Sequence, residues 1–327
     1  ISGLRGDGGG TYSATVPLAF AQTCNNIEID NCVLESLKSA AIVDDMVKFN
    51  VLYAAYPINN LRVHNSRLSG GSNSVVLTEP SDKVSFVNNE IVDFDIYGMY
   101  INEGTHLNIE GNRFAQRNNS NISPVASTIV YVENGTGRIV GNRTSSIKSS
   151  AAFKFKSFNS NNYAHDTNGL VANNEIMMVD GCGMEIGGIS YMDIINNSIL
   201  KNGKSASYGL YFEYLLPNMV NILNNNIVLK SSAADYPLYV KASTSMNSDY
   251  NNYYSTSGHL ALIDNMDIDT LSALQAISLS DRHSVVVSPV FLNETASAKL
   301  LDYHNLYCPT QASVPTDIEG INRDTLT

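Results

Sequence analysis

Apolar and polar residues alternate in a short pattern that recurs nine times along the chain. Each copy begins with two apolar residues two positions apart. Asn or Gly follows, then a second Asn or small residue, and an apolar residue closes the copy. The copies occupy residues 27–34, 61–68, 84–91, 107–114, 137–144, 169–176, 192–199, 220–227 and, less regularly, 247–254. Alternation with a period of two indicates a β-strand rather than a helix. The pattern therefore predicts a strand, a sharp corner and a second strand in each copy.

Two neighbouring columns of small polar residues mark the predicted corners. The first column contains Asn31, Asn65, Asn88, Gly111, Gly141, Asn173, Asn196, Asn224 and Asn251. The second contains Asn89, Asn112, Asn142, Asn174, Asn197, Asn225 and Asn252. Asn and Gly tolerate the left-handed backbone that a tight corner needs. A buried Asn side chain also satisfies its polar atoms by hydrogen-bonding its copy in the next repeat.

A further strand is predicted upstream of each corner. Triplets with apolar outer residues and a mostly tyrosine or charged middle residue lie at 75–77, 99–101, 130–132, 153–155, 184–186, 210–212 and 238–240. Such a strand has one buried and one solvent-facing side. A coil built from these strands buries its apolar side only by stacking on its neighbours. The predicted fold is therefore all-β, a solenoid of about nine coils with a length of about 43 Å.

Over residues 15–256, the row of corner asparagines resembles the right-handed parallel β-helix of the pectate-lyase-like superfamily. The resemblance implies a single-stranded parallel β-helix in residues 1–256. Residues 257–327 would form a C-terminal cap and tail of the same domain. The resemblance bears on fold rather than activity, because one fold carries many functions.

The C-terminal residues predict a cap for the solenoid. Leu271, Leu274 and Ile277 lie about one helical turn apart, so residues 268–279 predict a short helix, with Asp269 or Thr270 as its N-cap. Residues 283–292 predict a final strand with a proline break. Such caps cover the terminal core and strand edge of a solenoid.

Two motifs in this region resemble the tail of secreted bacterial β-helix proteins. The first is His283-Ser284, followed by Pro289 and Phe291, and the second runs from Asp317 through Gly320 to Arg323. The resemblance implies export and attachment to a bacterial cell surface. A longer polypeptide or a surface anchor is thus an expected partner.

Composition and charge exclude several classes of function. Lys and Arg number 20 against 31 Asp and Glu, a net charge of −11. No basic stripe of the kind that binds nucleic acid is present. No apolar run approaches the length of a membrane-spanning helix. The four cysteines form no CxxC pair, which argues against a metal cluster and leaves disulfide pairing open.

The solvent-facing residues of the triplets predict a glycan-binding surface. Stacked coils would place tyrosines in one file and polar groups in a second file, two positions further on. The candidate glycan-binding residues are Tyr100, Tyr131, Tyr211, Tyr239, Lys156 and Lys241. Aromatic faces cover the apolar faces of sugars, and neighbouring polar groups bind the hydroxyls. The alternative is that tyrosine is simply a favourable residue on the solvent side of a strand.

The same files offer candidate acid–base groups, namely Lys154, Glu185, Glu133 and Glu213. A polyuronate lyase needs a base and a cation that neutralises the substrate carboxylate, and the resemblance implies calcium for a lyase. A glycoside hydrolase needs two carboxyl groups across the cleft. The Gly-His-Gly and Arg-Ile-Lys motifs of β-helical polygalacturonases are missing. Glu185 beside Lys154 is the best acid–base pair, and the alternative is a surface ion pair.

Three functions remain open from the sequence. The leading hypothesis is an extracellular, adhesive module that binds a polysaccharide or other glycan, with no cofactor. The second is a polysaccharide lyase or glycoside hydrolase, and the third is a structural spacer in a larger adhesin. Residues 138–241 contain nine basic and seven acidic residues. A polyanionic sugar would therefore be tolerated only near the middle of the rod.

Overall fold

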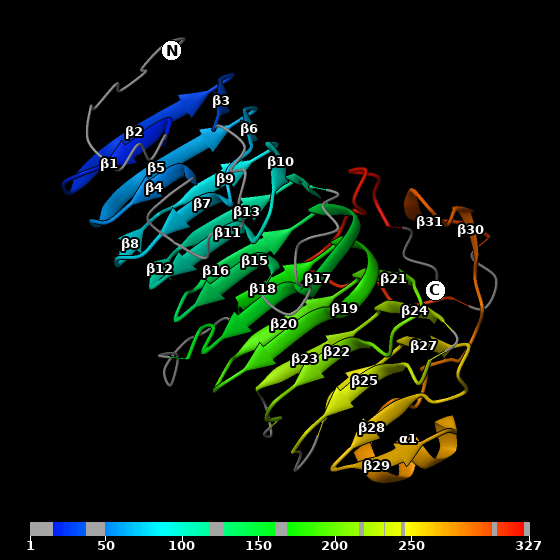
Figure 1. Ribbon diagram of the computed structural model, residues 1–327. Helices are drawn as coiled ribbons and strands as arrows, with labels where there is room; N and C mark the ends of the chain where they lie inside the picture. The colour runs from blue at the N-terminus through cyan, green and yellow to red at the C-terminus, as the bar shows by residue number, and fades with distance from the viewer. Residues whose placement is uncertain are drawn as a thin grey trace.

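The chain winds into a parallel β-solenoid of about seven turns (Figure 1). The structure is a computed structural model, and it describes residues 16–36, 50–117, 127–160, 169–215, 219–231, 233–242, 246–302 and 306–323. The predicted all-β solenoid is confirmed, with about seven turns in place of nine. Two of the nine sequence copies, 27–34 and 247–254, lie in the coils at the two ends.

The strands form three faces. Face I contains β1 (Leu18–Phe20), β4 (Asn50–Ala54), β7 (Asn73–Leu77), β11 (Tyr97–Asn102), β15 (Thr128–Glu133), the second halves of β17 (Arg143–Lys156) and β19 (Glu175–Gly187), β22 (Tyr208–Phe212), β25 (Tyr236–Val240) and β28 (Ala261–Ile263). Face II contains β2 (Cys24–Asp30), β5 (Ile58–His64), β9 (Ser85–Val87), β13 (Leu107–Glu110), β16 (Gly137–Val140), β18 (Gly169–Ala172), β20 (Met192–Ile195), β23 (Val220–Leu223) and β26 (Asn247–Asp249), with the short β8 (Ser81–Asp82) and β12 (Gly104–Thr105) beside them.

Face III contains β3 (Val33–Glu35), β6 (Arg67–Ser69), β10 (Glu90–Phe94), β14 (Arg113–Gln116), the first halves of β17 and β19, β21 (Ser198–Asn202), β24 (Asn226–Lys230) and β27 (Asn252–Ser255). Because β17 and β19 continue from face III into face I, these two faces form one 18-stranded sheet, and face II is an 11-stranded sheet. The asparagine corner lies between faces II and III.

The first asparagine column supplies the corner conformation. The backbone angle φ lies between 47° and 60° at six asparagines of this column, namely Asn31, Asn65, Asn88, Asn173, Asn196 and Asn224. Gly111 and Gly141 take the same conformation with φ of 66° and 68°. This left-handed region is disfavoured for most residues but tolerated by Asn and Gly. The column therefore turns the chain at the same point in successive coils, as the sequence predicts.

The second column forms a buried ladder of amide side chains. Its members Asn89, Asn112, Asn142, Asn174, Asn197, Asn225 and Asn251 are at most 2 % exposed. From Asn89 to Asn225, each Nδ2 donates to Oδ1 of the asparagine in the next coil at 2.9–3.1 Å. Each Oδ1 from Asn112 onward also accepts the backbone N–H of the preceding ladder residue. Every amide is thereby satisfied inside the solenoid.

Serine hydroxyls continue the ladder at both ends. The N–H of Cys32 donates to Oγ of Ser66, and the N–H of Ser66 donates to Oδ1 of Asn89. At the other end the N–H of Asn251 donates to Oγ of Ser284 at 3.0 Å. A serine hydroxyl accepts the backbone N–H as an asparagine amide does, but the serine side chain is shorter. At both ends of the ladder, serine thus takes the place of asparagine.

The last coil differs from the predicted register by one residue. The corner conformation falls on Tyr250, with φ of 57°, and not on Asn251. Asn251 instead joins the buried ladder, a place that the sequence pattern gives to Asn252. Asn252 bonds the chain after the cap, accepting from the N–H of Val287 and donating to its carbonyl. Consecutive asparagines fit two registers in the sequence, and the buried hydrogen bonds select one.

The interior between the three faces is one continuous apolar core. Its largest fully buried side chains include the phenylalanines Phe86, Phe94, Phe114, Phe153, Phe155, Phe158 and Phe212. Phe155 contacts Phe158 with ring centroids 5.2 Å apart, so aromatic packing continues from strand to corner. The core thus passes from coil to coil, as expected where each coil is stable only through its neighbours.

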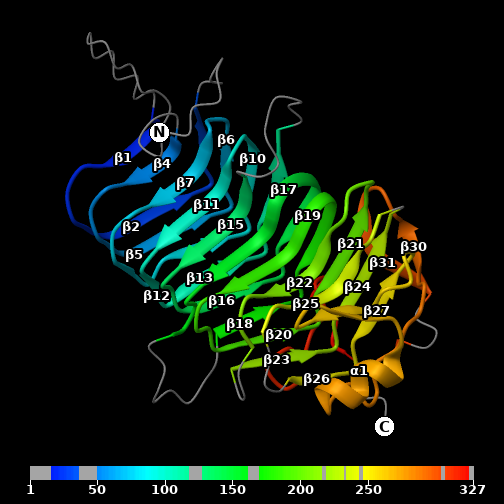
Figure 2. The same cartoon turned by 60° about the horizontal axis from the view of Figure 1, so that its bottom comes forward.

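A helix and a short strand close the last coil (Figure 2). Strand β29 (Met266–Ile268) runs antiparallel to β28, and α1 spans Leu271–Ser278. Thr270 caps α1, because its Oγ1 accepts the N–H of Ala273 at 3.3 Å. Leu274 is fully buried in the main core. The predicted helix is confirmed, with Thr270 rather than Asp269 as the N-cap.

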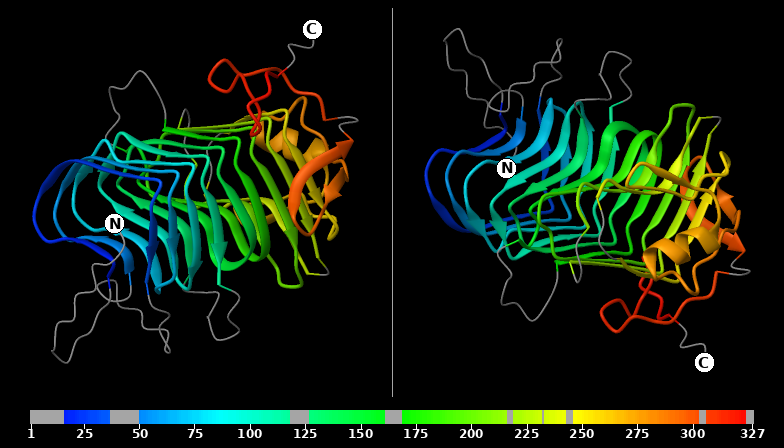
Figure 3. Two further views of the ribbon diagram at one scale, coloured as in Figure 1. Left: turned by 90° about the horizontal axis from the view of Figure 1, so that it is seen from above. Right: turned by 90° about the horizontal axis from the view of Figure 1, so that it is seen from below.

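The final strand of the cap is shorter than predicted. Only β30 (Val290–Asn293) forms in the region 283–292, and it pairs antiparallel with β31 (Ser297–Asp302). The preceding residues instead extend the solenoid, since Val285 bridges to Asn252. The hairpin β30–β31 packs on face III through Phe291, which contacts the side chains of Met177, Leu200 and Val228. The C-terminal segments thus lie along one side of the rod (Figure 3).

We predict that the buried ladder is a major source of stability. Asn142→Ala removes the acceptor of two buried donors of Asn112 and the donor to the carbonyl of Ile109. Unsatisfied buried polar groups should lower the free energy of unfolding by about 3 kcal/mol, as measured by chemical denaturation. The matched control is Asn59→Ala, an exposed asparagine that also bonds its copy in the next coil, with an expected loss of about 0.5 kcal/mol or less. Equal losses in the two variants would contradict the ladder's role.

Candidate functional site

The strand register of face I places the predicted outward residues in one file. Tyr100 lies opposite Tyr131, which lies opposite Lys154. Lys154 lies opposite Glu185, and the file continues through Tyr211 to Tyr239. All six side chains are partly exposed. The alternating pattern of the sequence is thus sufficient to order these residues along the rod.

A second file runs beside the first, two residues further along each strand. Asn102 lies opposite Glu133, which lies opposite Lys156. The next coil has Gly187, and there the carboxylate of Glu213 lies close to the backbone, 3.4 Å from the N–H of Gly188. Lys241 follows in the next coil and is exposed. The polar candidates therefore lie together on face I.

Three further tyrosines join this surface that the sequence pattern does not place there. They are Tyr97, Tyr208 and Tyr236, each three residues before a tyrosine of the first file. An offset of three predicts opposite sides of a strand. Between the two tyrosines lie consecutive buried residues, as at Gly98 and Met99, so both tyrosines stay outside. The recurring Tyr-x-x-Tyr spacing is the signal that identifies this third file.

The tyrosines gather into two clusters. The amino-terminal tyrosine cluster contains Tyr97, Tyr100 and Tyr131, with ring centroids 5.2–6.4 Å apart. The carboxy-terminal tyrosine cluster contains Tyr208, Tyr211, Tyr236 and Tyr239, with neighbouring centroids 4.8–6.3 Å apart. His259 extends it by stacking on the ring of Tyr236 at 4.9 Å. These spacings are typical of aromatic pairs that hold one another in place.

An ion pair separates the two clusters. Nζ of Lys154 lies 2.7 Å from Oε1 of Glu185, and both side chains are about one quarter exposed. The same ammonium group lies over the ring of Tyr131, 5.5 Å from its centroid. The pair that the sequence favours for acid–base chemistry is thus brought together, and it also adjoins the amino-terminal cluster.

Glu133 is the most highly bonded carboxylate of the surface. It accepts from Nζ of Lys156 at 2.6 Å and from the hydroxyls of Tyr131 at 3.1 Å and Tyr100 at 3.5 Å. Burial by itself raises the pKa of Glu133, but Lys156 and the two hydroxyls outweigh it and lower the pKa below the ordinary value. A general acid needs the opposite shift, so these contacts suit a structural carboxylate.

The two tyrosine hydroxyls beside Glu133 stay protonated over a wide range of pH. Burial raises the pKa of Tyr131 and of Tyr100, and the adjacent carboxylate raises both further. Burial has the same effect on the pKa of Tyr211. These groups therefore act as neutral hydrogen-bonding phenols at physiological pH.

The spacing of the carboxylates bears on hydrolysis. Glu133 and Glu213 are three coils apart along the file, about 14 Å at the backbone. Inverting glycosidases hold their carboxyl groups at about 6.5–9.5 Å and retaining ones at about 5–5.5 Å. Glu185 and Glu213 lie in adjacent coils with an offset of two residues, about 8 Å at the backbone. Of the sequence-predicted acids, Glu185 and Glu213 are thus the pair with a spacing near the inverting range.

Metal-ligating side chains, thiols and apolar helices are the other features of the described part of the chain that bear on function. There, no three His, Cys, Asp or Glu side chains form a group that would hold a metal ion. The four cysteines, Cys24, Cys32, Cys182 and Cys308, are free thiols. Within the same residues no helix has the length and apolar character needed to cross a membrane.

Comparison with known proteins identifies no relative of this chain. No family model, no curated protein and no solved structure matches it. The function is therefore inferred from the residues and geometry of the chain itself.

We predict that Lys156 holds the pKa of Glu133 down. In Lys156→Gln the ammonium group no longer offsets the burial of Glu133, so the pKa of Glu133 should rise. NMR titration of the carboxyl group measures this pKa. Because the folded-state pKa is lowered in the wild type, the pair stabilises the fold above the ordinary carboxyl range, and this contribution is lost as pH falls through the lowered pKa. Lys241→Gln, in the same file, should leave Glu133 unchanged. An unchanged Glu133 titration in Lys156→Gln would rule the coupling out.

Proposed function

We propose that this protein is an extracellular carbohydrate-binding module that holds a neutral polysaccharide chain along face I. The observation that carries the proposal is the pair of tyrosine clusters, seven partly exposed rings held in two groups along one side of a rigid rod. A surface of stacked coils is pre-organised, so little conformational entropy is lost when a ligand binds.

The chemistry of this surface suits a sugar chain. Tyrosine rings present apolar faces to the C–H faces of sugar rings, and their neutral hydroxyls bind sugar hydroxyls. The second file adds acceptors and donors such as Glu133 and Lys156, which lie opposite each other on face I. Successive coils repeat at about 4.8 Å, which is close to the length of one hexose in an extended chain.

The charge pattern favours a neutral polysaccharide over a polyuronate. Lys154 is paired with Glu185, and Lys156 with Glu133. A chain of uronic acids would need unpaired cations to neutralise its carboxylates. The hydroxyl groups of a neutral sugar need no such compensation. They can hydrogen-bond to lysine and glutamate side chains that are already in ion pairs.

Export to a bacterial cell surface is part of the proposal. It is supported by the resemblance of the coils to the pectate-lyase-like superfamily and by the His283-Ser284 and Asp317 to Arg323 tail motifs. An adhesive module of a longer surface polypeptide, with neither a metal ion nor a cofactor, is the arrangement that these features suit best.

We predict that both tyrosine clusters contribute to binding. Tyr100→Ala and Tyr211→Ala should each weaken binding of the best neutral polysaccharide from a glycan array about tenfold or more, because each removes a stacking ring. The control is Tyr56→Ala, a tyrosine that is 47 % exposed and belongs to neither cluster. Affinity would be measured by calorimetry with the full chain. Unchanged affinity in both cluster variants would remove face I from the proposal, and no glycan bound at all would favour a structural spacer.

We also predict a steep dependence on chain length. Tyr131 and Tyr211 lie three coils apart in one file, so only an oligosaccharide long enough to bridge about 14 Å contacts both clusters. Affinity should rise sharply at that length, since the second contact becomes intramolecular. In Tyr211→Ala the rise should disappear while short oligosaccharides keep their affinity. A smooth increase in both proteins would contradict a two-cluster site.

An enzyme is the second candidate, and the spacing of Glu185 and Glu213 is the observation that favours it. The best neutral polysaccharide from the glycan array would be incubated with the protein. The mixture would then be assayed for new reducing ends and for unsaturated products. The binding proposal expects neither product. Turnover that is abolished by Glu185→Gln and by Glu213→Gln would assign hydrolysis to face I instead.

A further inference from the structure

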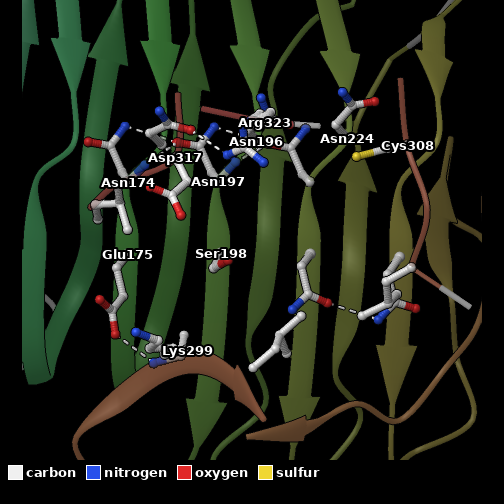
Figure 4. A pocket seen from close by; sticks show the side chains of 18 of the residues that line it. Asn174, Glu175, Asn196, Asn197, Ser198, Asn224, Lys299, Cys308, Asp317 and Arg323 are labelled. Atoms are coloured by element: carbon white, nitrogen blue, oxygen red, sulfur yellow. Dashed lines mark hydrogen bonds between the residues drawn. The ribbon is translucent and has the colours of Figure 1, made fainter. Parts of the chain in front are cut away.

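A cavity lies at the asparagine corner, where faces II and III meet (Figure 4). Its volume is about 580 Å³, within the range of pockets that hold small molecules. One wall is the corner of the coils that contain Asn173, Asn196 and Asn224. The other wall is the C-terminal chain, including residues 296–300 and 317–319. None of the tyrosines of face I lines it.

The C-terminal tail covers this corner through asparagines of the first column. Nδ2 of Asn173 donates to the carbonyl of Thr316 at 2.7 Å, and Oδ1 of Asn173 accepts from Nη2 of Arg323 at 2.8 Å. Two coils further on, Nδ2 of Asn224 donates to the carbonyl of Pro309 at 2.8 Å. The tail is thus fixed above the first and third of three consecutive corners.

Three polar atoms at the second and third of these corners are unpaired. Nδ2 of Asn196 has no hydrogen-bond partner among the described residues, and the same is true of Oδ1 of Asn224 and Nδ2 of Asn226. Asn196 and Asn224 are each only 9 % exposed. Buried amide groups are normally bonded, and these three atoms belong to residues that line one cavity. The residues that line the cavity therefore carry two donors and one acceptor that lack a partner in the described part of the protein.

The charged groups of the cavity are already compensated. Arg143 lies 3.3 Å from Glu175, and Lys299 lies 2.8 Å from Glu319. Oδ1 of Asp317 accepts the backbone N–H groups of Glu319 and Ile321. Arg323 donates to two uncharged oxygens, the carbonyl of Thr316 and Oδ1 of Asn173. These six side chains are three basic and three acidic groups, so together they carry no net charge. This balance favours a neutral occupant.

We propose that this cavity binds a neutral saccharide of one or two rings, at a site separate from face I. Sugar hydroxyls both accept and donate, so they match the unpaired donors of Asn196 and Asn226 and the unpaired acceptor of Asn224. Apolar side chains in the same lining, such as Val285 and Leu300, cover the C–H faces of the ring. The site is independent of the proposed role of face I.

The test uses the full chain carrying Tyr100→Ala and Tyr211→Ala, so that face I contributes little. Maltose, cellobiose and lactose are the probes, observed by saturation-transfer NMR and titrated for affinity. At least one should bind. Asn196→Gly keeps the corner conformation and removes a donor, and Asn226→Asp keeps the shape and replaces a donor with an acceptor. Each variant should weaken binding about tenfold, the effect of one hydrogen bond.

The matched control is Asn88→Gly, a corner of the same column that does not line the cavity. It should bind the probe as the parent does, and circular dichroism of each variant establishes that it is folded. No probe bound in the face I background would overturn the proposal, as would full affinity in a folded Asn226→Asp variant. A stronger response from a glucuronate-containing disaccharide would overturn the inference that the occupant is neutral.

Discussion

The hydrogen bond between asparagine side chains of adjacent coils is the interaction on which the rest of the molecule depends. Each ladder amide donates to the next amide and to a carbonyl of the preceding coil, while its oxygen accepts both an amide and a backbone N–H. One side chain thus fixes three successive coils in register. An apolar core tolerates small sliding of one coil on another, but these directional bonds do not. The order of residues along every outer face follows from that register.

The sequence predicts the register of face I because strand alternation has a period of two and because each coil carries its own corner. From Tyr100 to Tyr239 the file is correct at every coil. The third file is missed, since two buried residues between Tyr208 and Tyr211 break the alternation. The ambiguity at Asn251 and Asn252 has a similar origin, because adjacent asparagines satisfy the pattern equally well. The sequence period therefore predicts the register of the regular coils. Where a coil departs from that period, buried contacts determine the register.

The C-terminal tail illustrates what periodicity leaves undetermined. Ser284 ends the buried ladder, Phe291 packs on face III, and Arg323 bonds Asn173, which is 150 residues earlier in the sequence. These contacts give the tail motifs a structural role in closing the solenoid. They also create the corner cavity, and no property of the coils alone would predict it. The tail is hydrogen-bonded at Asn173 and at Asn224, and both residues line the cavity.

The ladder also bears on the two surfaces that we propose as binding sites. Coil-to-coil cohesion is supplied by the backbone, the core and the second asparagine column, and the ion pairs and tyrosine contacts of face I add to it. At the corner the first column has a conformational task, and its side chains remain available. The tail uses two of them, and the unpaired atoms of Asn196, Asn224 and Asn226 are the groups that the proposed saccharide would bind.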